Sequence, residues 1–254
     1  MTEETISGTP MQSSEEKKLK EEVSKGGANM KLQEDIKARC DLVNWVIAIS
    51  QKYNLSSAIM VQVIILFDKN VNKKVPSRDL TVLACFILVV ESLLPLTPFQ
   101  VVQICRNRFS YDEITKAKLE IKSVMKQEDI DNPIEMSNQF CDYLLKGGFF
   151  NSFISDVVKK MSSLFVLLVS FNPNFSAFNR KLLAICSVIL FTRDFLPRCD
   201  FKPESVFGNE YTDKIIEDSL NTFKRDLKNN LVSYRRFQSF DIIYKETEQY
   251  LKLN

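Results

Sequence analysis

Apolar residues recur from about residue 30 onward with the 3.6-residue period of an amphipathic helix. In the first such segment, one helical face carries Ile36, Cys40, Val43 and Ile47. Similar segments follow one another along the chain, separated by prolines, asparagines and serines. They predict helices at about 30–50, 57–70, 80–90, 99–107, 111–125, 134–146, 151–169, 176–193 and 211–228.

Two of these segments, 80–90 and 182–191, are apolar on almost every side and lie about a hundred residues apart. A helix that is apolar all round must be surrounded by other helices. The stretch 80–90 is about half of what a membrane span requires, so we expect it to be a core helix. The repetition predicts a duplicated all-α domain, with two groups of helices that each wrap around one buried central helix.

The same pattern suggests the boundaries of the domains. Residues 1–29 are rich in Ser, Thr, Glu and Lys, and we expect a disordered tail there. The two helical domains are expected at 30–130 and 131–230. Residues 231–254 predict a C-terminal helix that packs back on the body, with a partner-binding segment as the alternative.

Composition removes several classes of function. A formal net charge of +2 is too small to indicate nucleic acid or a membrane as the main partner. The chain has no histidine, no Gly-rich phosphate loop, no metal-ligand cluster and no nucleophile motif. We therefore expect no enzyme activity, no catalytic residue, no cofactor, no metal and no small-molecule substrate.

The six cysteines are scattered, and most of them lie in apolar runs, which is typical of free thiols in a reducing compartment. Residues 1–28 lack the apolar stretch of a secretory signal. We therefore expect a soluble protein of the nucleus and cytoplasm.

One spacing is more specific than the helical pattern. Arg39 stands six places before the single tryptophan, Trp45, and Asp68 lies 29 places after Arg39. Their surroundings read Ala-Arg-Cys-Asp-Leu-Val-Asn-Trp and Ile-Ile-Leu-Phe-Asp-Lys-Asn-Val. This arrangement resembles the first box of a cyclin. The Pro95-Leu96-Thr97 stretch and the Tyr111-Asp112-Glu113 helix start are similar to D-type cyclins and their herpesviral relatives.

The resemblance covers residues 30–228, through motifs in the first half and through the helix pattern in the second. It implies two tandem cyclin-fold domains, each a five-helix bundle around a buried central helix. It also implies a regulatory subunit that binds a cyclin-dependent protein kinase as a heterodimer. Such a subunit activates or retargets its kinase, and a compact two-box chain is also similar to viral cyclins that control the host cell cycle or transcription. The alternative is a cyclin-fold adaptor in transcription regulation that activates no kinase.

The resemblance also assigns roles to individual residues. In cyclins, the residues that match Arg39 and Asp68 form a buried ion pair between the first two helices. The kinase-contacting Lys and Glu of the family correspond to Glu91 and Lys118, so the signs of the two charges are reversed here. The two side chains are expected to pair with each other, while a carboxylate at position 91 offers no donor to kinase carbonyls.

The patch by which many cyclins dock Arg-x-Leu peptides corresponds to Ala38, Asp41 and Trp45. Asp41 places a carboxylate where an aliphatic side chain normally receives the leucine of the peptide, and burying that charge unpaired is unfavourable. We expect the docking of such peptides to be impaired. Asn44 replaces the usual Asp before the tryptophan, a change that keeps hydrogen bonding and removes charge.

Overall fold

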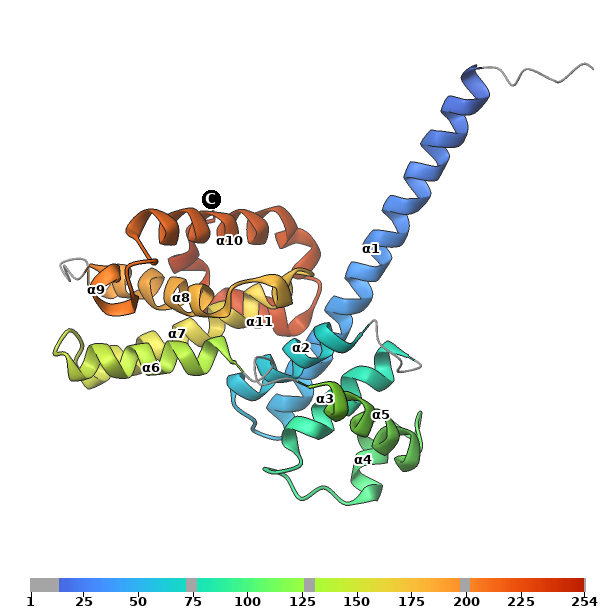
Figure 1. Ribbon diagram of the computed structural model, residues 1–254, viewed down its shortest axis with the longest axis horizontal. Helices are drawn as coiled ribbons and strands as arrows, with labels where there is room; N and C mark the ends of the chain where they lie inside the picture. Colours follow the sequence, from blue (N-terminus) through green and yellow to red (C-terminus); the bar gives the residue numbers. More distant parts are fainter. Residues whose placement is uncertain (1–13, 72–76, 126–130, 197–201, 254) are drawn as a thin grey trace, which may run out of the picture. The chain divides into compact units, whose positions relative to one another are not determined.

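The computed structural model describes residues 14–71, 77–125, 131–196 and 202–253, with side chains from residue 33 onward. Within these ranges the chain forms helices and no strand, which confirms the all-α class (Figure 1). The chain divides into two compact units, Met1–Arg39 and Cys40–Asn254. No helix in the described part of the chain is long and apolar enough to cross a membrane.

Helix α1 (Ser14–Lys52) begins inside the segment for which we expect disorder. Residues 15–22 are mainly Glu and Lys, which have high helix propensities even where no apolar face is available to bury. Residues 14–29 of that segment belong to α1 in the structure. Residues 1–13 lie outside the described residues.

A first group of helices surrounds α3 (Arg78–Val90), which contacts α2 (Ser57–Asn70) and α5 (Tyr111–Val124). The short helix α4 (Pro98–Ile104) contacts α5. On the second half of α1, Trp45 meets Phe86 of α3 edge to face, with ring centroids 5.8 Å apart. Nine residues of α3 are buried, as its apolar sequence predicts.

The helix starts of this group agree with the sequence because each has an N-capping side chain. Ser56, Ser77, Thr97 and Ser110 accept hydrogen bonds from backbone N–H groups in the first turns of α2, α3, α4 and α5. Thr97 and Ser110 form reciprocal capping boxes with Gln100 and Glu113.

A second group surrounds α8 (Arg180–Phe195), in which residues 183–192 are all buried (Figure 1). Helix α8 contacts α6 (Pro133–Lys146), α7 (Ser152–Val169) and α10 (Asp213–Tyr234). Two boundaries differ from the prediction. Residues 175–177 form the separate 3₁₀ turn η2 (Phe175–Ala177) before α8, and α10 continues to Tyr234. The short helix α9 (Pro203–Phe207) is not predicted.

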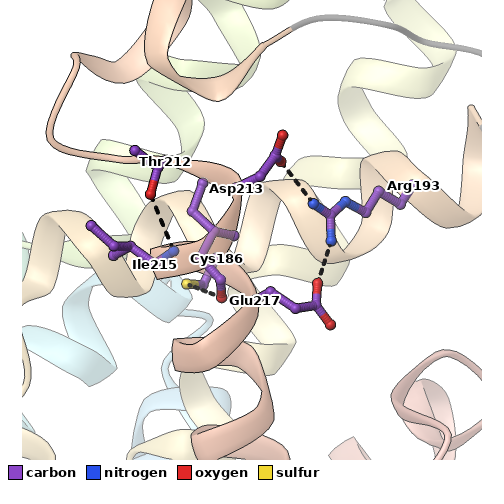
Figure 2. A network of polar contacts seen from close by, with 7 residues as sticks. Cys186, Arg193, Thr212, Asp213, Ile215 and Glu217 are labelled. Atoms are coloured by element: carbon purple, nitrogen blue, oxygen red, sulfur yellow. Dashed lines mark hydrogen bonds and ion pairs between the residues drawn. The ribbon is translucent and has the colours of Figure 1, made fainter.

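Arg193 links the end of α8 to the start of α10 (Figure 2). Its two terminal nitrogens lie 2.7 Å from Glu217 Oε2 and 3.1 Å from Asp213 Oδ1. A cation in the last turn of α8 and a carboxylate in the first turn of α10 each complement the dipole of their own helix. This clamp therefore positions α10 on the central helix of the second group.

The last helix, α11 (Gln238–Leu251), packs on α7 and α8 and buries Phe240, Ile243 and Leu251. The start of α11 is also hydrogen-bonded to α1: the Ser239 N–H donates to Asn44 Oδ1 at 3.0 Å.

The two groups share an interface within the unit Cys40–Asn254, where α2 contacts α6, α7 and η2. Asn132, the N-cap of α6, donates from Nδ2 to the carbonyl of Ala58 at 2.7 Å and accepts from the Ile134 N–H. Residues 126–130 lie outside the described residues, and the predicted division at 130/131 stays a prediction.

Candidate functional site

Glu91 and Lys118, the charge-reversed pair, meet across the space between α3 and α5. Glu91 ends α3, where its N–H bonds the carbonyl of Ile87, and Lys118 lies in the third turn after the start of α5. Lys118 Nζ donates to Glu91 Oε2 at 2.6 Å. The Lys118 side chain is 21% exposed and that of Glu91 40% exposed, so the pair stands at the surface and contributes at most about 1 kcal/mol to stability.

The pair lies at the edge of a small hollow of about 110 Å³. Its other walls are largely apolar and come from the ends of α3 and α5 and from the loop that leads into α4. They comprise Ile87, Leu94, Pro95, Leu96, Val101, Tyr111, Ile114 and Thr115. A hollow of this size admits one side chain of a partner, whereas pockets for drug-sized ligands measure about 300–1,000 Å³.

Large apolar side chains are exposed on the elements that form this hollow. Leu93 is 55% exposed and Phe99 is 69% exposed in and after the loop, while Leu119 on α5 is 58% exposed. These exposed residues were not predicted from the sequence. For α5 the signal is the helical period, because Ile114, Ala117 and Ile121 are buried and Leu119 falls on the opposite face. For the loop residues 91–97, no period exists to read.

Arg39 and Asp68, the expected buried ion pair, are both at least partly buried. Arg39 is buried, with 9% of its surface exposed. Asp68, on α2, is partly buried, and its charge together with burial raises the pKa of the Cys85 thiol on α3, burial being the larger cause. Both Arg39 and Asp68 take part in polar or electrostatic interactions. Their pairing with each other stays a prediction.

The residues of the expected docking patch differ in exposure. Ala38 and Trp45 are partly buried, and Asp41 is exposed. Asp41 and Trp45 line one hollow of about 370 Å³ together with Asp79, Arg106 and Arg108. Asp79 Oδ2 is bound by Arg108 Nη2 at 2.6 Å. The Asp41 carboxylate therefore borders this hollow, and impaired docking of Arg-x-Leu peptides stays a prediction.

The cysteines that the structure describes are mostly buried. Cys40, Cys85, Cys105, Cys141 and Cys186 are free, as predicted, and Cys199 lies outside the described residues. Burial raises the pKa of the Cys141 thiol and that of the Cys186 thiol to about 12 each. Among the described residues no group of three or more His, Cys, Asp or Glu side chains is placed to hold a metal ion.

Comparison of the chain with protein-family models and with curated protein sequences finds no match.

Proposed function

We propose that this chain is a cyclin-like regulatory subunit that binds a cyclin-dependent protein kinase through the face formed by α3 and α5. The observation that carries the proposal is the Lys118–Glu91 pair at the edge of a small hollow, with large apolar side chains exposed on the elements that form it. An interface of this composition, with apolar anchors and a few charged groups that set orientation, is typical of protein–protein recognition.

Under this proposal Lys118 takes the donor role that a lysine at the end of the third helix has in cyclins. Its ammonium group carries three N–H donors, and the bond to Glu91 Oε2 uses one of them. The other two N–H groups can donate to backbone carbonyl oxygens of a partner, such as those at the C-terminal end of a helix. Glu91 holds the lysine in place instead of contacting the kinase directly.

The partner helix that packs on this face is the mobile helix of the kinase. When it is held inward, its glutamate meets the lysine that positions ATP, and the activation segment is released. Most of the binding energy then comes from burial of apolar surface around Leu93, Phe99 and Leu119, at roughly 25 cal/mol per Å².

A binding assay with a panel of purified cyclin-dependent kinases tests this proposal. Lys118→Ala should weaken binding of the kinase by about 2–5 kcal/mol, the usual loss when one partner of a desolvated interfacial charge pair is removed. The Glu91→Lys/Lys118→Glu double variant restores the charge order of cyclins and should change which kinases bind or how active they are. A matched control is the Lys159–Asp142 pair of the second group, also 2.6 Å long, exchanged in the same way.

Kinase binding that survives Lys118→Ala, Leu119→Ala and Phe99→Ala unchanged would contradict the proposed face.

If no kinase binds, the second candidate function takes precedence. It is a cyclin-fold adaptor for transcription proteins, and the reversed order of the two charges favours it. Capture of transcription factors without kinases, by the same panel of variants, separates the two functions.

A further inference from the structure

A second and larger cleft lies between the second half of α1 and helix α4. Its volume is about 480 Å³, within the roughly 300–1,000 Å³ of ligand-binding clefts. It adjoins the 370 Å³ hollow described above, with which it shares Trp45, Ile104 and Arg106. Its lining comprises Trp45, Ala48, Ile49, Lys52, Tyr53, Gln100, Gln103, Ile104 and Arg106. None of these residues borders the Glu91–Lys118 hollow.

The charged side chains that line this α1–α4 cleft are all cationic. Lys52, the exposed last residue of α1, and Arg106, exposed in the turn after α4, are cationic, and no residue that lines it is Asp or Glu. The nearest carboxylates in the adjoining hollow are Asp41 and Asp79, of which Asp79 is bound by Arg108. A cleft with two cations and no acid attracts anionic groups.

The cations are not needed to satisfy the helix ends beside them. Near the end of α1, the N–H groups of Asn54 and Leu55 bond the carbonyls of Gln51 and Ser50. After α4, the N–H groups of Arg106 and Asn107 bond the carbonyls of Gln103 and Val102. Backbone N–H groups thus already donate to these carbonyls, so Lys52 and Arg106 are not required as their donors.

The backbone that carries Arg106 is held in a costly conformation. Arg106 and Asn107 have φ values of 53° and 59°, and a non-glycine residue in this left-handed region costs about 1–2 kcal/mol. Such outliers cluster at ligand-binding segments, where the surrounding structure maintains them. Here the left-handed turn brings a guanidinium group to the edge of the cleft.

The remaining lining residues suit a peptide. Trp45 and Tyr53 offer aromatic surface for an apolar side chain, and Gln103 is an exposed amide that donates or accepts. Gln100 uses Oε1 in the capping box with Thr97, which leaves its NH₂ group as a donor to a carboxylate or peptide carbonyl.

We propose that the α1–α4 cleft binds an acidic peptide segment of a partner protein. Carboxylates of the peptide lie on Lys52 and Arg106, and an apolar side chain packs on Trp45 and Tyr53. This site is independent of the proposed kinase face, so either proposal stands without the other. A basic peptide is disfavoured by the same two cations.

The single tryptophan of the chain makes the test direct, because Trp45 lines the cleft and no other residue emits its fluorescence. The probe is the blocked peptide Glu-Leu-Glu-Leu-Glu-Leu-Glu, titrated into the full chain at low salt, with Lys-Leu-Lys-Leu-Lys-Leu-Lys as the charge-reversed control. The acidic peptide should give a saturable change in Trp45 emission that weakens as salt is added, and the basic peptide should give none.

The Lys52→Glu/Arg106→Glu variant should bind the acidic peptide at least ten-fold more weakly and gain affinity for the basic one. Lys228→Glu, at an exposed position on α10, is the matched control and should leave binding unchanged. Circular dichroism of each variant establishes that it is folded. The proposal fails if the two peptides change the emission equally, if neither saturates at millimolar concentration, or if Lys228→Glu weakens binding as much.

Discussion

Asn44 joins the first helix of the unit Cys40–Asn254 to the last one through a single side chain. Its Oδ1 accepts from the Ser239 N–H at 3.0 Å, and Ser239 Oγ lies 3.5 Å from the Asn44 carbonyl oxygen. The N-cap residue of α11, Phe237, has no side-chain acceptor, so Asn44 serves this helix start from a position 195 residues away. The sequence predicts retained hydrogen bonding at position 44, and the structure supplies the partner.

Replacing Asn44 by Ala should therefore destabilise the protein. The Ser239 N–H is then left without its acceptor in a partly buried place, at a cost of about 1–3 kcal/mol. Asn44→Asp keeps an acceptor and should cost less. Urea denaturation measures both changes, and hydrogen exchange should show faster exchange in the first turn of α11. Asn230→Ala, which removes an exposed bond to the Asp226 carbonyl, is the control.

Burial of the cysteines leads to a prediction about thiol chemistry. The raised pKa of each of the Cys85, Cys141 and Cys186 thiols keeps it protonated at pH 8, below its folded-state pKa, and burial blocks reagents as well. In a Cys199→Ser background, a disulfide reagent should label one thiol rapidly, that of the partly exposed Cys105.

A further Cys105→Ser change should abolish that rapid phase, and the other thiols should react only on unfolding. Rapid labelling of two or more thiols in the folded Cys199→Ser protein would contradict the burial described for α3, α6 and α8.

At the scale of elements, the enclosed helices α3 and α8 were predictable because an apolar surface on every side of a helix has only one stable environment. The boundaries were less predictable. The sequence predicts a helix start at about residue 176, yet residues 175–177 form η2 and α8 begins at Arg180, after the N-cap Asn179. Helix α9 was missed because five residues carry no readable period.

Helix α8 offers a comparison between burial and surface charge. Phe191 is fully buried and contacts Phe165 and Tyr250, so Phe191→Ala should cost about 3–5 kcal/mol. Arg193→Ala breaks two ion pairs whose side chains are about half exposed, and it should cost at most about 1 kcal/mol.

Urea denaturation of the two variants gives both values, and added salt should reduce only the effect of Arg193→Ala. An Arg193→Ala loss as large as that of Phe191→Ala would show that the clamp in Figure 2 governs the packing of α10.

At the scale of the molecule, the two groups of helices share the contacts of α2 with α6, α7 and η2, and α11 receives a bond from α1. The duplicated pattern predicts two groups but says nothing about this interface. The predicted cyclin fold and the Arg39–Asp68 pair remain proposals at this scale.

The shared interface predicts cooperative unfolding of the two groups. Trp45 reports only on the first group, where it contacts Phe86, while far-ultraviolet circular dichroism reports on all helices. The two urea transitions should coincide. The Phe191→Ala substitution in α8 should shift the Trp45 transition to lower urea as well. A Trp45 transition that stays in place would indicate that the groups unfold separately.

The sequence by itself determined the all-α class, the two enclosed helices, the capped helix starts of the first group and the free state of the five described cysteines. These follow from local rules, since period, capping and burial depend on residues a few positions apart. Only the tertiary structure decided that Asn44 accepts from Ser239 and that Lys52 and Arg106 border one cleft. A helical period shows which face is apolar but does not identify the neighbour that covers it.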